Sequence, residues 1–191
     1  PPILAAYHAA WPQVGIELVT GTSCALAAKV RNYEIEAAFV AQPFPADGLA
    51  AIDAFKEELT LISPLAWGAI TSARDLGDRT VIAFAAGCSY RRILESWLNH
   101  EGLAPGRVME FASYHAIVAC VAAGSGVAIV PRSVLAVLGA EHSVCVSALS
   151  GPYAHAQTQL VWRADDDTPA LQALRQQLSL IHISEPTRLR R

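Results

Sequence analysis

Three short polar stretches of this 191-residue sequence each lie between an apolar segment and a predicted helix, at residues 19–24, 84–91 and 111–115. The first residues of a helix have free amide N–H groups and lie at the positive end of the helix dipole, so they favour carboxylates and phosphates. Ser and Thr are also the usual helix caps, and capping is the simpler explanation for any one stretch. Only convergence of all three on one cleft would favour a ligand site.

Four residues of these stretches, or next to them, have specific chemistry with open alternatives. Arg91 falls in the first helical turn, where its charge opposes the dipole, so it is either solvent-exposed or paired with an anion. Cys88 could be a reactive thiol with a lowered pKa, although a small buried residue is the more typical role. His115 could bind a ligand, titrate, or be an ordinary half-buried histidine. Arg92 fits a solvated surface charge.

No set of residues has the pattern of a known catalytic or metal site. Residues 124–126 read Gly-Ser-Gly, but they follow a helix, whereas a nucleophile elbow follows a strand. Gly21 and Gly87 belong to no phosphate-binding fingerprint, and residues 165–167 lack the spacing of a calcium loop. No pair is spaced like a metal site or a secreted disulfide framework among Cys24, Cys88, Cys120 and Cys145. We therefore expect no catalytic residue, metal or cofactor.

The composition is that of a globular α/β protein without a nucleic-acid surface of its own. Apolar residues make up 53% of the chain and charged residues 16%, which is enough for a hydrophobic core. The net charge is −3 and the globular part has no basic cluster, so we expect that this chain does not bind DNA by itself. No apolar run reaches the roughly 18 residues of a membrane span, and no signal peptide is visible. We expect a cytoplasmic protein that makes no membrane contact.

Predicted strands and helices alternate along the chain, which favours parallel sheets covered by helices. Hydrophobic periodicity and caps predict helices at residues 3–11, 24–33, 89–101, 114–123, 133–138 and 169–178, with a helical turn at 72–76. Alternating or β-branched segments predict strands at residues 15–19, 35–40, 57–63, 80–84, 108–111, 126–130, 144–149 and 158–162.

Both ends of the sequence look artificial. The chain starts at Pro1 without a methionine, and residues 179–191 resemble a translated sequencing adapter more than a natural basic tail. We expect a fragment and leave residues 179–191 out of the fold.

Several stretches together resemble the co-inducer-binding domain of LysR-type transcriptional regulators, over about residues 1–178. The matching stretches are residues 11–22, 29–40, 55–62, 86–91, 121–131 and 160–163. The resemblance implies an α/β fold of the periplasmic-binding-protein type 2, with two lobes of mixed, mainly parallel sheets flanked by helices. Residues 1–64 would begin lobe I, 65–161 would form lobe II, and 162–178 would return to lobe I.

The resemblance also implies a site and partners. A small anionic metabolite would bind between the lobes, and the chain would act within a dimer or tetramer. Trp11 and Trp97 are either core residues or, by this resemblance, interface anchors. The implied effector contacts, together with their polar neighbours, are Thr22, Ser23, Cys88, Ser89, Tyr90, Arg91, Ser113, Tyr114 and His115.

The sequence departs from the family pattern at its start. The winged helix-turn-helix, the linker helix and the first strand of lobe I are absent, so promoter DNA would be reached only through the missing N-terminal domain. The missing strand leaves an exposed sheet edge, and the loop that follows it normally supplies effector contacts in the family. Two other functions share the scaffold: a transporter's solute-binding protein, which would need export, and a small-acid enzyme. For the enzyme, His115 and Glu95 are the only nearby acid or base candidates. An upstream helix-turn-helix or signal peptide would separate regulator from transporter.

Overall fold

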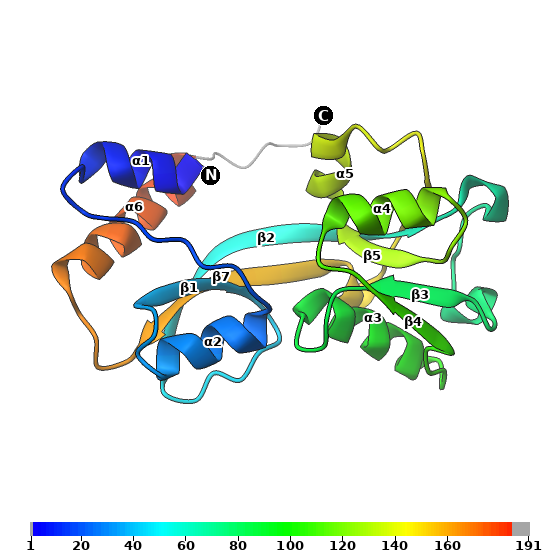
Figure 1. Ribbon diagram of the computed structural model, residues 1–191, viewed down its shortest axis with the longest axis horizontal. Coiled ribbons are helices and arrows are strands. Elements are labelled where there is room, and N and C mark those ends of the chain that lie inside the picture. Colours follow the sequence, from blue (N-terminus) through cyan, green and yellow to red (C-terminus); the bar gives the residue numbers. More distant parts are fainter. Residues whose placement is uncertain (1, 185–191) are drawn as a thin grey trace.

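A computed structural model describes residues 2–184 as two lobes joined by two long strands (Figure 1). The helices are α1 (Pro2–Ala10), α2 (Ser23–Arg31), α3 (Ser89–His100), α4 (Tyr114–Ala122), α5 (Arg132–Leu138) and α6 (Pro169–Ser184). The strands are β1 (Ala37–Ala41), β2 (Leu49–Ser63), β3 (Thr80–Ala83), β4 (Arg107–Glu110), β5 (Ala128–Pro131), β6 (Cys145–Ala148) and β7 (His155–Arg163). Short 3-10 helices lie at Leu65–Trp67, Ala73–Leu76 and Gly151–Tyr153.

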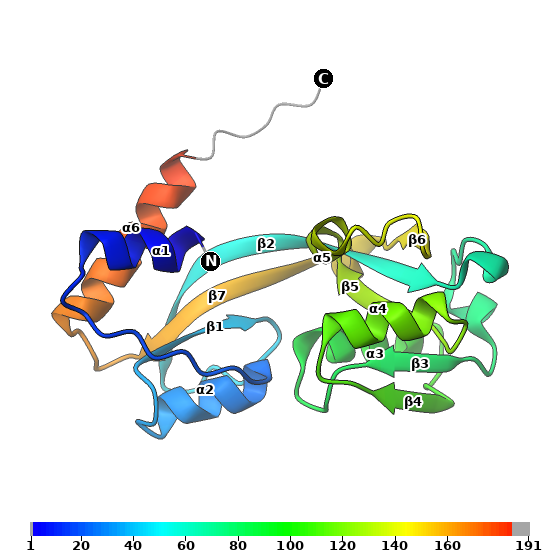
Figure 2. The ribbon, with the colours of Figure 1, turned by 45° about the horizontal axis from the view of Figure 1, so that its top comes forward.

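The long strands β2 and β7 connect lobe I, which holds α1, α2, β1 and α6, to lobe II, which holds β3–β6 and α3–α5 (Figures 1 and 2). They pair antiparallel from Leu49 opposite Arg163 to Glu58 opposite His155. In lobe I, β1 adds to the free side of β7, and in lobe II, β2 continues beside β5 and β6. Any change in the angle between the lobes must therefore bend or twist this two-stranded connection.

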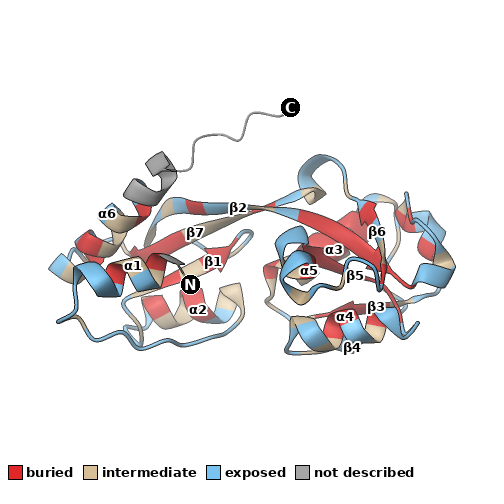
Figure 3. Ribbon diagram, turned by 90° about the horizontal axis from the view of Figure 1, so that it is seen from above, coloured by how far each residue is buried: buried red, intermediate tan, exposed pale blue. Residues whose placement is uncertain are grey.

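Each lobe has its own hydrophobic core. In lobe I, Leu26 and Val30 of α2 pack on one face of the sheet, and Leu171 and Leu178 of α6 pack on the other. In lobe II, α3 and α4 cover opposite faces of β3, because successive residues of a strand point to opposite sides. The helices accordingly show one buried and one exposed face (Figure 3).

The boundary between the two hydrophobic cores lies within the connecting strands. Ala54 belongs to the core of lobe I and Leu59 to that of lobe II, while on β7 Ala156 belongs to lobe II and Leu160 to lobe I. The exact boundaries at residues 64/65 and 161/162 stay predictions.

The predicted strand at residues 15–19 is wrong. These residues are extended, but within residues 2–184 they pair with no strand. Ile16, Leu18 and Val19 are exposed, Leu18 by 69%. Alternating apolar residues give a segment the means to be a strand, but a β-strand exists only where a neighbour supplies the ladder hydrogen bonds.

The two-lobed α/β architecture is confirmed, but the expectation of mainly parallel pairing is wrong for the described residues. β2 pairs antiparallel with β5, β6 and β7, and β7 pairs antiparallel with β1. Parallel pairing occurs between β3 and β4 and at the single bridge from Val81 to Val127. The cause is that β2 and β7 cross between the lobes in opposite directions, and both strands continue into the sheets of the two lobes.

The other predicted elements are present, with three of them longer than expected. β2 begins at Leu49 and β7 at His155, ahead of residues 57 and 158, because the alanines in the early part of both strands have low β-propensity and weaken the strand signal. α6 continues to Ser184, past residue 178, whereas residues 185–191 of the predicted artificial tail lie outside the described residues. Among the helices of the described chain, none has the length and apolar content needed to cross a bilayer.

Candidate functional site

The first two predicted loops meet where the lobes face each other, at the start of α2 and the turn before α3 (Figures 1 and 2). The Cys24 amide donates a hydrogen bond to the Gly87 carbonyl across this junction, with an N···O distance of 3.4 Å. Gly87 has φ of +89°, which favours glycine, and a Cβ there would lie 3.1 Å from Thr22 Oγ1. The close approach of the two loops therefore depends on glycine at position 87.

Two serine side chains are hydrogen-bonded to the end of β1 and to the residues that follow it. Ser89 is buried, and its hydroxyl donates to the carbonyl oxygens of Ala41 and Pro43. Ser23 Oγ accepts a hydrogen bond from the Ala41 amide, with an N···O distance of 3.2 Å. The junction thus has a second contact between the lobes, and sequence reasoning missed residues 41–43 because an apolar strand end followed by prolines carries no functional signal.

The third loop joins the second through aromatic contacts inside lobe II. Tyr114 meets Phe84 edge to face, with ring centroids 4.8 Å apart, and its centroid is 6.4 Å from that of Tyr90. Tyr90 in turn donates a hydrogen bond to the Glu57 carboxylate on β2. Glu57 was missed because it stands among exposed charged residues of the strand, and only the tertiary fold brings it to Tyr90.

Hydroxyls at the helix starts of the first and third loops also act as caps. Thr22 Oγ1 accepts from the Ala25 amide, and Ser113 Oγ accepts from the Ala116 amide, both at 3.3 Å. Ser113 and His115 are exposed, on the first turn of α4 and just before it. The capping explanation is therefore correct for these two hydroxyls, while convergence of all three loops on one ligand cleft stays a prediction.

Burial shapes the protonation of the thiol and the phenols in this cluster. The pKa of Cys88 is raised because burial disfavours the thiolate, and backbone hydrogen bonds and Arg91 oppose that shift only in part. Cys88 is half-buried, and its raised pKa fits a structural thiol better than an activated one. Burial also raises the pKa of Tyr90, with smaller upward contributions from Tyr114 and Glu57. Burial raises the pKa of Tyr114 as well, with smaller upward contributions from Glu57 and Cys88, while its hydrogen bond with Tyr90 opposes the shift.

These phenols predict a loss of stability at alkaline pH. In the unfolded chain they ionise near pH 10, whereas the folded pKa values are higher. Their contribution to stability is therefore complete below about pH 10 and is lost as pH rises, because the unfolded chain releases the protons first. We expect Tyr90→Phe to flatten the fall of the free energy of unfolding between about pH 9.5 and 11, measured by urea denaturation. An unchanged slope would contradict this.

Arg91 and Arg92 lie in different environments, Arg91 paired with carboxylates and Arg92 exposed. Arg91 lies 2.9 Å from a carboxylate oxygen of Glu95 and 2.9 Å from one of Glu110, so its charge is matched within lobe II. Arg92 is exposed, with Nη1 3.3 Å from the Pro43 carbonyl and 3.9 Å from Cys24 Sγ. The positive charge at the lip of the junction is thus that of Arg92.

The two tryptophans lie in different environments. Trp97 is 9% exposed and packs in the core of lobe II, which is the core alternative. Trp11 follows α1 and is 47% exposed. An interface role stays a prediction for both, and only Trp11 offers an exposed ring.

A cavity of about 320 Å³ opens beside the junction, against the connecting strands. Its lining includes a cationic group, Lys56, and comes from both lobes and the connection: Gln42, Pro43, Lys56, Ile93, Pro152, His155, Ala156 and Gln157. Ile93 stands one turn along α3 from Ser89, so the cavity adjoins the serine contact. Space of this size suits a small organic ligand. Within the described chain, no group of three or more His, Cys, Asp or Glu side chains could hold a metal ion.

Comparison with known proteins identifies a family. A family model described as the LysR substrate binding domain matches residues 1–179. The transcriptional regulator GltR of Bacillus subtilis is 35% identical over 174 residues, which is 91% of this chain and 59% of GltR. The regulator SoxR of an Arthrobacter species is 34% identical, over 86% of this chain and 56% of SoxR. The chain thus spans less than two thirds of these relatives, which are named as transcriptional regulators.

Solved structures share the fold at low sequence identity. The effector binding domain of QuiR in complex with shikimate superposes with a TM-score of 0.79 at 17% identity, covering 97% of this chain and 90% of that one. The BenM effector binding domain with benzoate superposes with a TM-score of 0.73 at 19% identity, covering 100% and 90%.

Proposed function

Because this chain belongs to the LysR substrate-binding domain family, we propose that it senses a small anionic metabolite bound between its two lobes. The observation that carries this proposal is the meeting of the first two helix-opening loops between the lobes, where the Cys24 amide is hydrogen-bonded to the Gly87 carbonyl, with Tyr114 of the third loop beside Tyr90 of the second. In the complete protein, the bound metabolite would control transcription.

Three features support an anion as the ligand. The starts of α2 and α3, which are the positive ends of the two helix dipoles, lie at the junction, one from each lobe. Two cationic side chains stand beside it, Arg92 at the lip and Lys56 in the cavity. The related domains of known structure were determined with shikimate, benzoate and sulfate, which are all anions. We place Arg92, rather than Arg91, beside the ligand, together with Thr22 and Tyr114.

The ligand would act by shifting the balance between two arrangements of the lobes. With the Cys24 amide hydrogen-bonded to the Gly87 carbonyl, the first two loops are closed on each other, so a ligand between them requires a wider arrangement. A ligand that binds one arrangement more tightly increases its population by its difference in affinity. In the full-length dimer or tetramer, this change would reposition DNA-binding domains on a promoter in the cytoplasm.

Calorimetric titration tests the proposal. This chain, and a longer one that includes the sequence upstream of residue 1, are titrated with benzoate, shikimate, sulfate and a panel of related carboxylates. We expect saturable binding of at least one anion. Thr22→Val should weaken it about tenfold or more, because one hydrogen bond to a charged ligand contributes about 1.5–3 kcal/mol.

Ser133→Ala on the exposed start of α5 is the matched control, because it removes one hydroxyl far from the junction. If both chains are folded by circular dichroism and bind no member of the panel, the proposed anion site is wrong.

A further inference from the structure

Two of the four cysteines come from different lobes and meet at the junction. Cys24 lies in the first turn of α2 in lobe I, and Cys88 directly precedes α3 in lobe II. The Cys24 amide is hydrogen-bonded to the Gly87 carbonyl, and Cys24 Cβ lies 3.4 Å from the place of a Cβ on residue 87. All four cysteines are free thiols. We propose that Cys24 and Cys88 are a dithiol site that forms a disulfide bond between the lobes when the protein meets a hydroperoxide.

The two loops that carry these cysteines lie side by side. A disulfide needs Cα atoms about 4.4–6.8 Å apart, and the hydrogen bond from Cys24 to Gly87 sets the backbones of the two cysteine loops side by side. Residue 87 has no side chain to stand between them. After burial, charge repulsion from Cys24 is among the effects that raise the pKa of Cys88, as expected for neighbouring thiols. Cys120 packs against the core of lobe II and Cys145 lies on β6, so neither belongs to the junction.

The chemistry requires only the two thiols and the peroxide. We assign the attack on the peroxide to Cys24, whose Sγ lies 3.9 Å from Nη1 of the exposed Arg92, whereas burial raises the pKa of the Cys88 thiol. Cys24 sulfur attacks one peroxide oxygen, the O–O bond breaks, and the other oxygen leaves as water or alcohol. The resulting sulfenic acid is attacked by Cys88 sulfur, which forms the S–S bond and releases water. Two thiols are oxidised and one peroxide is reduced.

The bond would lock the closed arrangement of the lobes. It would tie the start of α2 to the start of α3 and prevent the separation that a ligand between Thr22 and Gly87 requires. This consequence rests on the proposed function, whereas formation of the bond does not.

Peptide mass spectrometry after peroxide treatment tests the bond without any ligand. Trypsin cleaves after Lys29, Arg79 and Arg91, so Cys24 and Cys88 each fall alone in their peptides, residues 1–29 and 80–91. We expect these two peptides to appear joined, two hydrogens lighter than their sum, in monomeric protein, and to separate with dithiothreitol. The double variant Cys120→Ser/Cys145→Ser is the matched control and should give the same product. Unlinked peptides, or a link to Cys120 or Cys145, would overturn the proposal.

The order of attack has its own readout. With dimedone present during oxidation, Cys88→Ser should accumulate a sulfenic-acid adduct on Cys24, because no second thiol is near to resolve it. Cys24→Ser should accumulate much less on Cys88. The reverse pattern would contradict the role assigned to Cys24. A disulfide that forms in a chain that binds no anion would leave this proposal intact and count only against the proposed ligand.

Discussion

Replacing Gly126 with alanine is expected to lower the free energy of unfolding by about 3 kcal/mol, near the upper end for overpacked sites. A Cβ at this position would lie 2.3 Å from the Thr80 carbonyl oxygen and 3.1 Å from Ile82 Cγ1. The backbone cannot move aside cheaply, because Thr80 accepts a hydrogen bond from Val127 and Ile82 donates one to Val127. These bonds hold the strand β3, which leads into the loop at Gly87, so the substitution should disturb lobe II of the junction.

Thermal and urea denaturation measure this effect. A loss of about 3 kcal/mol corresponds to a melting temperature lower by roughly 6–12 °C for a chain of this size. Gly106→Ala is the matched control in the same lobe, because its Cβ would meet only the Asp78 carbonyl at 3.9 Å, an ordinary contact. Equal melting temperatures for the two variants would show that the approach of Gly126 to β3 does not limit stability.

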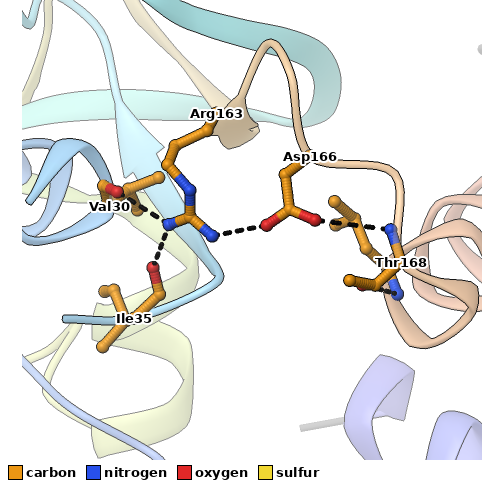
Figure 4. A network of polar contacts seen from close by, with 6 residues as sticks. Val30, Ile35, Arg163, Asp166 and Thr168 are labelled. Atoms are coloured by element: carbon orange, nitrogen blue, oxygen red, sulfur yellow. Dashed lines mark hydrogen bonds and ion pairs between the residues drawn. The ribbon is translucent and has the colours of Figure 1, made fainter. Parts of the chain in front are cut away.

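Replacing Arg163 with methionine is expected to cost about 3–5 kcal/mol, the usual loss when one member of a buried ion pair is removed. Arg163 Nη1 donates to the carbonyl oxygens of Val30 at 2.8 Å and of Ile35 at 3.0 Å, and Nη2 pairs with Asp166 (Figure 4). Both paired side chains are only 12% exposed. Methionine keeps much of the apolar stem but leaves the Asp166 carboxylate and two carbonyls without this donor.

The network also concerns the site, because Val30 belongs to the last turn of α2 and the first turn of that helix contributes to the junction. Adding Asp166→Asn to Arg163→Met should recover part of the loss by removing the unpaired charge. Arg132→Met is the control, since its pair with Glu58 is more than half exposed and should contribute less than about 1 kcal/mol. A loss for Arg163→Met no larger than for Arg132→Met in urea denaturation would contradict the structural role of this network.

Local pattern predicted most of the fold. The spacing of Ile93, Leu94, Trp97 and Leu98 predicts the buried face of α3, and all four are buried in the core of lobe II. The strand prediction for residues 15–19 was wrong because an alternating pattern does not show whether a partner strand is present. The prediction of mainly parallel pairing was wrong for a similar reason. The direction of pairing depends on the path of β2 and β7 between the lobes and not on any local sequence.

The candidate site likewise contains residues that local sequence predicted and residues that it did not. Polar residues at helix starts marked Thr22, Ser23, Cys88 and Ser89, and these come together at the junction. Glu57 and Arg92 carried no distinguishing local signal. Glu57 looks like one more charge on a half-exposed strand, and Arg92 differs from Arg91 only by one helical position, about a 100° rotation around the axis.

The sequence by itself determined the alternation of helices and strands, the caps that open α2 and α4, and the family pattern, because these depend on residue type and short-range spacing. Only the tertiary structure decided which loops touch, which arginine faces the junction, and that Cys24 of one lobe lies beside Cys88 of the other. Such contacts join residues that are far apart in the sequence, and they depend on how two connecting strands set the lobes against each other.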